Sequence, residues 1–282
     1  MIASTIKNAS LPREDEYLVV GDVHGCVDEL KQLLRQNGFS IDKNELIHPS
    51  SSAKSIILLG DFVDKGSRKK IGETIEFIHK NYIHLNQKRQ RFYLIMGNHE
   101  IMVERFISND STLEMTPENL IKKEKYYNTV ELLEHDIALK EKFLEIYSWC
   151  YPWLKYTYSS EFSATFTHAP CEKKYLAKED MNSYNKMIKS ASRSKNIGIK
   201  LDKLLAYTHE EAEDNTHYHI FGHLSQPNIR QYKNRVCIDT SVIYGDALSG
   251  AIIKRDKLTF DKVNFLGEQN QATQTYNLLF DF

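Results

Sequence analysis

Four short polar motifs, each placed directly after an apolar or β-branched stretch, constrain this chain more than any other feature. They are Gly21-Asp22-Val23-His24-Gly25, Gly60-Asp61-Phe62-Val63-Asp64-Lys65-Gly66, Gly97-Asn98-His99-Glu100 and Gly222-His223. The stretches before them, 17–20, 56–59, 92–96 and 217–221, have the composition of buried strands. Open α/β sheets place their chemistry just beyond the carboxyl ends of such strands. The series of motifs therefore predicts a single site along a sheet edge.

The side chains in these motifs are of the kinds that bind metal ions. Carboxylate oxygen, amide oxygen and imidazole nitrogen together suit Mn²⁺, Fe or Zn²⁺. The candidate ligands are Asp22, His24, Asp61, Asn98, His223 and, after the apolar stretch 162–167, His168. A single catalytic metal uses about three or four protein ligands and keeps a position open. This larger set fits two divalent ions sharing one carboxylate, a pair that clamps the oxygens of an in-line displacement and acidifies a water.

In this order the motifs, with Thr167-His168-Ala169 before the last, resemble the calcineurin-like metallophosphoesterase superfamily. Within it they resemble the phosphoprotein phosphatase branch in its compact bacterial and phage form. The stretch 237–251 is also similar to the closing strands of the diadenosine tetraphosphatases. The resemblance spans about 17–253, and 108–158 and 171–215 match only loosely. It implies an α/β fold, a metallophosphoesterase-type β-sheet sandwich flanked by helices, as a single domain over 1–282 with a mostly helical insertion at 108–158.

The resemblance also implies a role for each ligand. Asp22 and His24 would bind the first ion, Asp61 would bridge, and the second ion would be completed by Asn98, His168 and His223. A hydroxide bridging the ions would attack phosphorus directly, without a phospho-enzyme. Mn²⁺ is the expected metal, with Fe and Zn²⁺ as alternatives.

Two further residues would serve the leaving group. His99, oriented by Asp64, would act as the catalytic acid that protonates the leaving oxygen.

Phosphate binding is where this chain departs from the family pattern. The phosphoprotein phosphatases usually carry arginine at the position of Lys65, and lysine lacks the bidentate fork of arginine. Relatives that cleave nucleoside polyphosphates more often have lysine there, yet many diadenosine tetraphosphatases lack the carboxylate that this chain keeps as Asp64. A second phosphate-binding arginine is expected past His168. Arg193 and, on the third helix, Arg105 are the candidates.

Three functions follow from these features. The first is a metal-dependent phosphatase acting on phosphoprotein, with phosphoserine or phosphothreonine favoured and phosphotyrosine possible. The alternative is a hydrolase of dinucleoside polyphosphates, a phosphorylated small-molecule substrate. The third is a catalytically inactive binding module on the same fold.

Composition excludes other classes of partner. Lys and Arg number 37 against 38 Asp and Glu, so no basic surface for nucleic acid is expected. No run of about 18 apolar residues predicts a membrane span. The first 16 residues are polar and lack the apolar core of a signal peptide, and the four cysteines show no CxxC spacing. A reduced, cytoplasmic setting is expected, and export without a signal peptide stays open.

Periodicity predicts the remaining layout. Helices are expected over 28–36, 69–80 and 100–107, over most of 117–149, and over 179–190 and 200–207. Strands are expected at 235–239, 249–254 and 258–265. The early alternation of strands and helices predicts parallel pairing. The insertion ends in an aromatic-rich run, 147–158, whose rings either pack on the core or line the site and receive a peptide or nucleobase.

Overall fold

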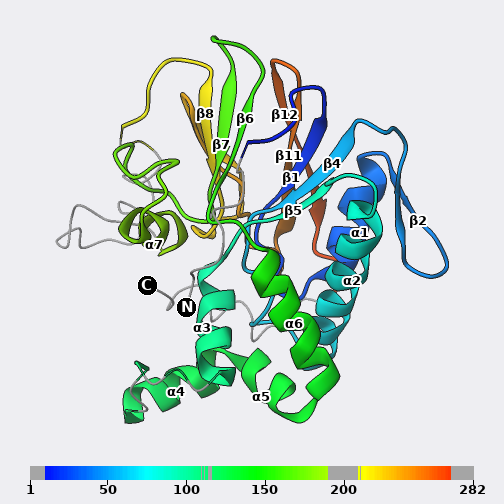
Figure 1. Cartoon of the computed structure of the whole chain (residues 1–282), viewed down its shortest axis with the longest axis vertical. Coiled ribbons are helices and arrows are strands. Elements are labelled where there is room, and N and C mark those ends of the chain that lie inside the picture. Colours follow the sequence, from blue (N-terminus) through cyan, green and yellow to red (C-terminus); the bar gives the residue numbers. More distant parts are fainter. Residues whose placement is uncertain are drawn as a thin grey trace.

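The computed structural model describes residues 10–108, 110, 112–113, 116–189, 209 and 211–267. These residues form two five-stranded sheets that pack against each other, with a layer of helices against the first sheet (Figure 1). The first sheet has the order β12-β11-β1-β4-β5. Its strands are β1 (Glu16–Val20), β4 (Lys54–Leu58), β5 (Phe92–Leu94), β11 (Ala247–Lys254) and β12 (Lys257–Asn264).

The first sheet is apolar on both faces. Tyr17 and Val19 of β1 belong to the core between the two sheets, whereas Leu18 and Val20 belong to the core under the helices. This division follows from the alternation of side chains along a strand. β1 pairs in parallel with β4, and β4 with β5, which confirms the parallel pairing expected from the sequence. The motifs after these strands consequently emerge at the same edge.

The core between the first sheet and the helices is completed by side chains of four helices. They are α1 (Val27–Gln36), α2 (Arg68–Asn86), α5 (Asn128–His135) and α6 (Ile137–Trp149). In α1 the leucines at 30, 33 and 34 lie on one stripe and are almost completely buried. Each leucine buried in this way contributes about 1.5–3 kcal/mol. α1 and α2 lie side by side along the sheet (Figure 1), so they fix the two βα turns that carry the first two motifs.

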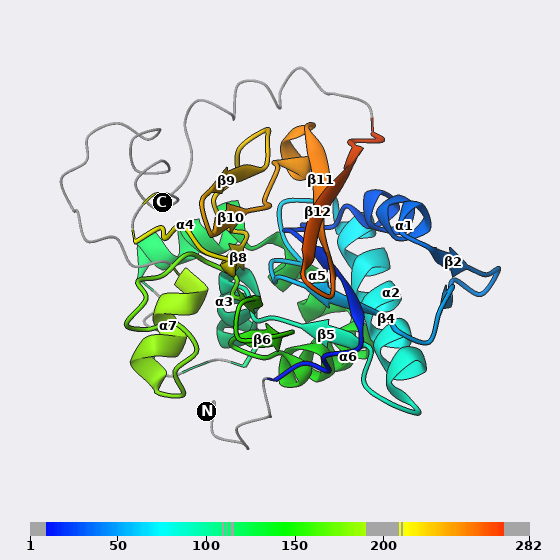
Figure 2. The ribbon, with the colours of Figure 1, turned by 90° about the horizontal axis from the view of Figure 1, so that it is seen from above.

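The second sheet has the order β6-β7-β8-β10-β9. Its strands are β6 (Leu154–Thr157), β7 (Ser163–Phe166), β8 (His217–Phe221), β9 (Arg230–Tyr232) and β10 (Arg235–Cys237). β7, β8 and β10 are parallel. Ala164 and Phe166 face the inter-sheet core, so Ser163 and Thr165 lie on the opposite face. Helix α7 (Met181–Lys189) lies near β6 in the view from above (Figure 2), and Met187 packs there against Trp153 and Cys171.

The segment 108–158 contains α4 (Pro117–Tyr126), α5 and α6, as expected for 117–149, and it ends in strand β6. Most rings of the aromatic run 147–158 pack against the rest of the protein. Tyr151, Trp153 and Tyr156 are buried, and Trp149 stacks on Tyr82 with ring centroids 4.2 Å apart. These contacts support the packing interpretation of the run.

Most other elements agree with the sequence. Helix α3 (Asn98–Ile107) and the closing strands β11 and β12 begin within two residues of their predicted starts. The hairpin of β2 (Phe39–Ile41) and β3 (Ile47–Pro49) was not predicted, and the helix expected at 200–207 lies outside the described residues. In the part of the chain that the structure describes, no helix is long and apolar enough to cross a membrane.

Candidate metal centre

Strands from both sheets end at the site. β1, β4 and β5 of the first sheet lead into the first three motifs, and β7 and β8 of the second lead into His168 and His223. Among the residues that the structure describes, two groups of potential ligands result, each with its ligand atoms within 4.8 Å of one another. One group is His24, Asp61 and His99, and the other is Asp61, His168 and His223. Asp61 belongs to both groups.

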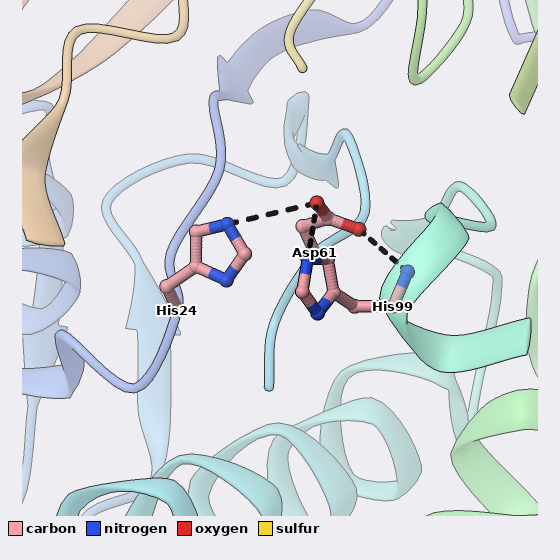
Figure 3. Close-up of side chains that lie close together, drawn as sticks. All are labelled: His24, Asp61 and His99. Carbon is pink, nitrogen blue, oxygen red and sulfur yellow. Dashed lines mark hydrogen bonds and ion pairs between the residues drawn. The ribbon is translucent and has the colours of Figure 1, made fainter. Parts of the chain in front are cut away.

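The first group is drawn in Figure 3. His24 Nε2 lies 3.6 Å from Asp61 Oδ2, and His99 Nε2 lies 3.9 Å from the same oxygen. His24 Nδ1 is 2.8 Å from the carbonyl oxygen of Val63. A ring N–H donated to that carbonyl leaves the Nε2 lone pair directed at Asp61, which is the usual arrangement of a metal-binding histidine.

The second group faces the other oxygen of Asp61. His168 Nε2 lies 3.4 Å from Asp61 Oδ1, 3.2 Å from His223 Nδ1 and 2.9 Å from Asn98 Oδ1. His168 Nδ1 is 2.8 Å from the Leu59 carbonyl oxygen, so donation to that oxygen makes Nε2 an acceptor. With a bare Nε2, the ring and Asn98 Oδ1 offer two acceptors that a divalent ion can share; without an ion, a proton on Nε2 joins them, in keeping with the raised pKa of His168. This donor set fits a divalent ion.

Asp22 is held by the last motif. Both of its carboxylate oxygens lie 3.1 Å from the backbone N–H of His223, which donates to them. A Cβ atom on Gly222 would lie 2.0 Å from Asp22 Oδ1. Glycine at 222 is therefore required for the carboxylate to reach this place.

The protonation of the histidines suits ligands. Burial, then the charge of Lys65, lowers the pKa of His24 well below its usual value. Burial, then His168, lowers the pKa of His223 to about 3. Both rings are therefore neutral near pH 7, as metal binding demands. Burial opposes charge on His168 too, but Asp61 and Asp22 raise its pKa to about 10, so the centre favours a positive charge at this position.

The pKa values of the carboxylates are likewise set by burial and by neighbouring charges. Burial raises the pKa of Asp22 well above its usual value, and the neighbouring Asp239 raises it further. Burial would also raise the pKa of Asp61, but His168 and His99 hold it well below its usual range. Packed carboxylates of this kind are stabilised by cations.

The backbone of the site is strained. His24, Asp61, Asp64 and His223 all have positive φ, at 44°, 49°, 65° and 66°. Such a conformation costs a residue with a side chain roughly 1–3 kcal/mol and is concentrated at functional sites. The hydrogen bonds of the loops must offset this cost.

His99 is oriented by a hydrogen bond to Asp64, which is held in turn by helix α5. Its Nδ1 lies 2.7 Å from Asp64 Oδ2, and its backbone N–H donates to Asp61 Oδ1 over 3.0 Å. Asp64 is fixed in turn by Thr129 of α5, since Thr129 N donates to Asp64 Oδ1 over 3.0 Å and Asp64 N donates to Thr129 Oγ1 over 2.9 Å. His99 Nε2 is thereby directed toward Asp61. The ring of Tyr127 packs beside it, with centroids 5.3 Å apart.

Sequence reasoning assigned no role to Glu100, which connects two motifs. Its carboxylate accepts hydrogen bonds from the backbone N–H groups of Asp61, Phe62 and Gly97 over 2.8, 2.8 and 3.1 Å. A signal was present, because a glutamate three positions after the residue that precedes a helix can accept that residue's backbone N–H, which is one half of a capping box. Burial, then Asp61, raises the pKa of Glu100 to about 7.

The phosphate-binding candidates are placed differently. Lys65, within the second motif, is exposed, and its Nζ lies 5.7 Å from the ring centre of Tyr244. Arg105 bonds to Asp110, Nε to Oδ2 over 2.8 Å, and none of its described contacts reaches the metal-binding groups. Arg193 lies outside the described residues.

Comparison with known proteins agrees with this geometry. The family model of the calcineurin-like phosphoesterases matches residues 16–245. The chain belongs to the calcineurin-like phosphoesterase family. The family expected from the motifs is thus confirmed, as is the mixed α/β fold with helices flanking the sheets. Members of this family are metal-dependent phosphoric ester hydrolases, so the chain is a hydrolase of this class.

The chain is similar to curated proteins from several bacteria that carry the name bis(5'-nucleosyl)-tetraphosphatase PrpE [asymmetrical], among them the following two. The protein from Oceanobacillus iheyensis is 26% identical over 82% of this chain and 86% of its own length. The protein from Bacillus mycoides is 24% identical over 83% and 89%.

Two solved structures share the fold. A putative diadenosine tetraphosphatase matches with a TM-score of 0.55 and 14% identity over 92% of this chain and 98% of its own. A Saccharomyces cerevisiae protein serine/threonine phosphatase with similarity to human phosphatase PP5 matches with 0.52 and 12% over 94% and 85%.

Proposed function

We propose that this phosphoesterase hydrolyses dinucleoside polyphosphates such as diadenosine tetraphosphate, at a centre of two divalent ions. The motifs alone favoured phosphoprotein as the substrate, with this activity as the alternative. The observation that carries the proposal is the likeness, over more than four-fifths of the chain, to relatives named for the tetraphosphatase activity. Lys65, at the position where phosphoprotein phosphatases usually carry arginine, supports the same substrate class.

The family resemblance, taken with the two ligand groups, gives each ion its residues, although the groups themselves hold His99 and lack Asp22 and Asn98. Asp22, His24 and Asp61 would hold one ion, and the other would be held by Asp61 with Asn98, His168 and His223. Bound there, two divalent ions, Mn²⁺ by preference, supply positive charge to the phosphate oxygens and lower the pKa of a water. Asp61 suits the shared position because its two oxygens face different groups, Oδ2 toward His24 and Oδ1 toward His168.

The protein itself supplies the proton for the leaving group. To act as the acid, His99 must be in its imidazolium form, in which Nδ1–H donates to Asp64 Oδ2 and a second proton on Nε2 faces the ligand groups from the start of α3. Donation from Nε2 to the leaving oxygen completes cleavage of the phosphorus–oxygen bond. Lys65, exposed at the rim, would bind the phosphates that are not attacked.

The His99–Asp64 pair also favours a second candidate, a phosphomonoesterase acting on phosphoserine or phosphothreonine in proteins. A serine alkoxide is a far more basic leaving group than a nucleotide phosphate, so its departure depends strongly on a general acid. The 2.7 Å contact between Nδ1 and the carboxylate supplies a histidine suited to that task.

One assay separates the candidates. The full chain, supplied with Mn²⁺, is offered diadenosine tetraphosphate and a phosphoserine peptide, and kcat/KM is measured for each. We expect the tetraphosphate to be the better substrate and to yield ATP and AMP, as asymmetrical cleavage requires. A higher kcat/KM for the peptide would favour the phosphomonoesterase, and turnover of neither would favour an inactive binding module.

A further inference from the structure

A chain of hydrogen bonds leads from strand β8 to the turn that carries His168. His219 Nε2 lies 2.7 Å from Thr167 Oγ1, and Thr167 Oγ1 donates to the carbonyl oxygen of Ala169 over 2.7 Å. Thr167 and Ala169 are the two neighbours of His168 in the sequence. The chain of bonds therefore closes across a residue that belongs to the second group of potential ligands.

The direction of each bond in this chain follows from its chemistry. A hydroxyl has one proton, and that of Thr167 is donated to the Ala169 carbonyl oxygen, so the hydroxyl oxygen must accept from His219 Nε2–H. Burial, then the charge of Arg235, lowers the pKa of His219 well below its usual value, so the ring is neutral and carries its one proton at Nε2. Donation from this N–H polarises the hydroxyl and strengthens its own donation to Ala169.

His219 is a rigid anchor for this chain of bonds. It is 2% exposed, its ring centroid lies 5.0 Å from that of Phe221, and its backbone N–H donates to the carbonyl oxygen of Asn234 over 2.8 Å. Its Nδ1 is also buried and has no hydrogen-bond partner among the residues that the structure describes. Within the described part of the chain, the ring is therefore held in the fold by packing and by its bond to Thr167.

The two strands joined by this bond carry both histidines of the second group. β7 leads to His168, β8 leads to His223, and the two strands pair in parallel. Beyond the strand ends, the backbone N–H of Gly222 donates to the carbonyl oxygen of His168 over 2.8 Å. The bond between His219 and Thr167 is a further link at the same place. Because it is made by side chains, it can be removed by substitution while the backbone link stays.

We propose that His219 is a positioning residue for the second ion. By fixing the Thr167 hydroxyl on the Ala169 carbonyl oxygen, it holds the turn from which His168 Nε2 faces Asp61 Oδ1 at 3.4 Å. The inference rests on the proposed two-ion centre, and it gives His219 no contact with metal or substrate. Residues that orient metal ligands typically change metal affinity about 10–100-fold when they are replaced. Since His219 acts through Thr167, we expect the lower end of this range.

The test is a titration of the full chain with Mn²⁺, in which electron paramagnetic resonance measures the free ion and two dissociation constants are fitted. His219→Phe keeps a planar ring and removes the N–H, and Thr167→Val removes the hydroxyl with little change in shape. His217→Phe is the matched control, because His217 is exposed at the start of the same strand and its Nδ1 lies 2.9 Å from Ser163 Oγ. Urea denaturation of each variant monitors the fold.

We expect the wild-type protein to bind two ions per chain. His219→Phe and Thr167→Val should each weaken one of the two ions about 10-fold and leave the other within about twofold of wild type. The double variant should lose no more than either single variant, because both residues act through one bond. His217→Phe should bind both ions as wild type does. Excess Mn²⁺ should restore the turnover of His219→Phe, which a defect of folding would not allow.

Three results would overturn the inference. If His219→Phe and Thr167→Val bind both ions with wild-type affinity, His219 does not position the second ion, and the two-ion centre still stands. If His217→Phe weakens the same ion equally, the effect belongs to strand β8 as a whole. If the wild-type protein takes up fewer than two ions, the two-ion centre fails together with the inference. Should His219→Phe not fold, Thr167→Val carries the same test, since it removes the other partner of the bond.

Discussion

Thr129 offers a sharp test of how the helical segment supports the site. Thr129 is fully buried, and its Oγ1 accepts the backbone N–H of Asp64 over 2.9 Å. Thr129→Val keeps the shape of the side chain but leaves this N–H without a partner. A buried donor left unsatisfied costs about 1–3 kcal/mol, partly offset by the added methyl group at up to about 0.8 kcal/mol. We expect a net loss of roughly 1–2 kcal/mol in the free energy of unfolding.

The same change should disturb catalysis selectively. Asp64 has φ of 65° and contacts His99 at 2.7 Å, so a loosened turn at Asp64 releases the imidazole before it releases any metal ligand. We expect kcat to fall about 10-fold for a substrate with a basic leaving group and to change little for an aryl phosphate, whose phenolate needs little protonation. Metal content should stay the same.

Urea denaturation measures the free energy of unfolding, and kcat for the two substrates measures the effect on catalysis. Thr129→Ser is the matched variant. Serine keeps the hydroxyl and loses one methyl, so its cost should be near 1 kcal/mol and its kinetics close to wild type. The reasoning is refuted if Thr129→Val is as stable as wild type within about 0.5 kcal/mol, or if both substrates slow equally.

Three further predictions concern the metal centre and its neighbours. Chelation should abolish turnover and Mn²⁺ should restore it, while Asp61→Asn should lower metal content, measured by plasma mass spectrometry, more than any other single ligand change. His99→Asn should lower kcat roughly 10²–10⁴-fold with metal content unchanged, and loss of metal would make His99 a ligand instead. Gly222→Ala should displace Asp22 and reduce both metal content and activity, because its Cβ would lie 2.0 Å from the carboxylate. Gly72→Ala in α2 is the control, since its Cβ would meet nothing closer than 3.6 Å and should stabilise the helix by about 0.5–1 kcal/mol.

The sequence predicted the site best where a ligand residue comes directly after a strand. Asp22, Asp61 and Asn98 come two, three and four residues after a strand end, so a local pattern of apolar residues, glycine and ligand is sufficient to predict them. The parallel pairing of these strands then brings the ligands together.

Contacts between distant segments were not predictable. The Thr129–Asp64 bonds join residues 65 apart, and no local pattern marks a threonine in a helix as the partner of a turn. The hairpin of β2 and β3 was missed because three-residue strands are too short to show a period. The aromatic run 147–158 gave no sign of which surface its rings would cover, and Tyr127, outside that run, is the ring beside His99.

The central proposal is that two ions share Asp61, and electron paramagnetic resonance of the Mn²⁺-loaded protein tests it most directly. With two equivalents bound per chain, we expect the spectrum of an exchange-coupled Mn²⁺ pair, and Asp61→Asn should abolish the coupling. A spectrum of isolated Mn²⁺ in the wild-type protein, at one or two equivalents per chain, would contradict the shared site.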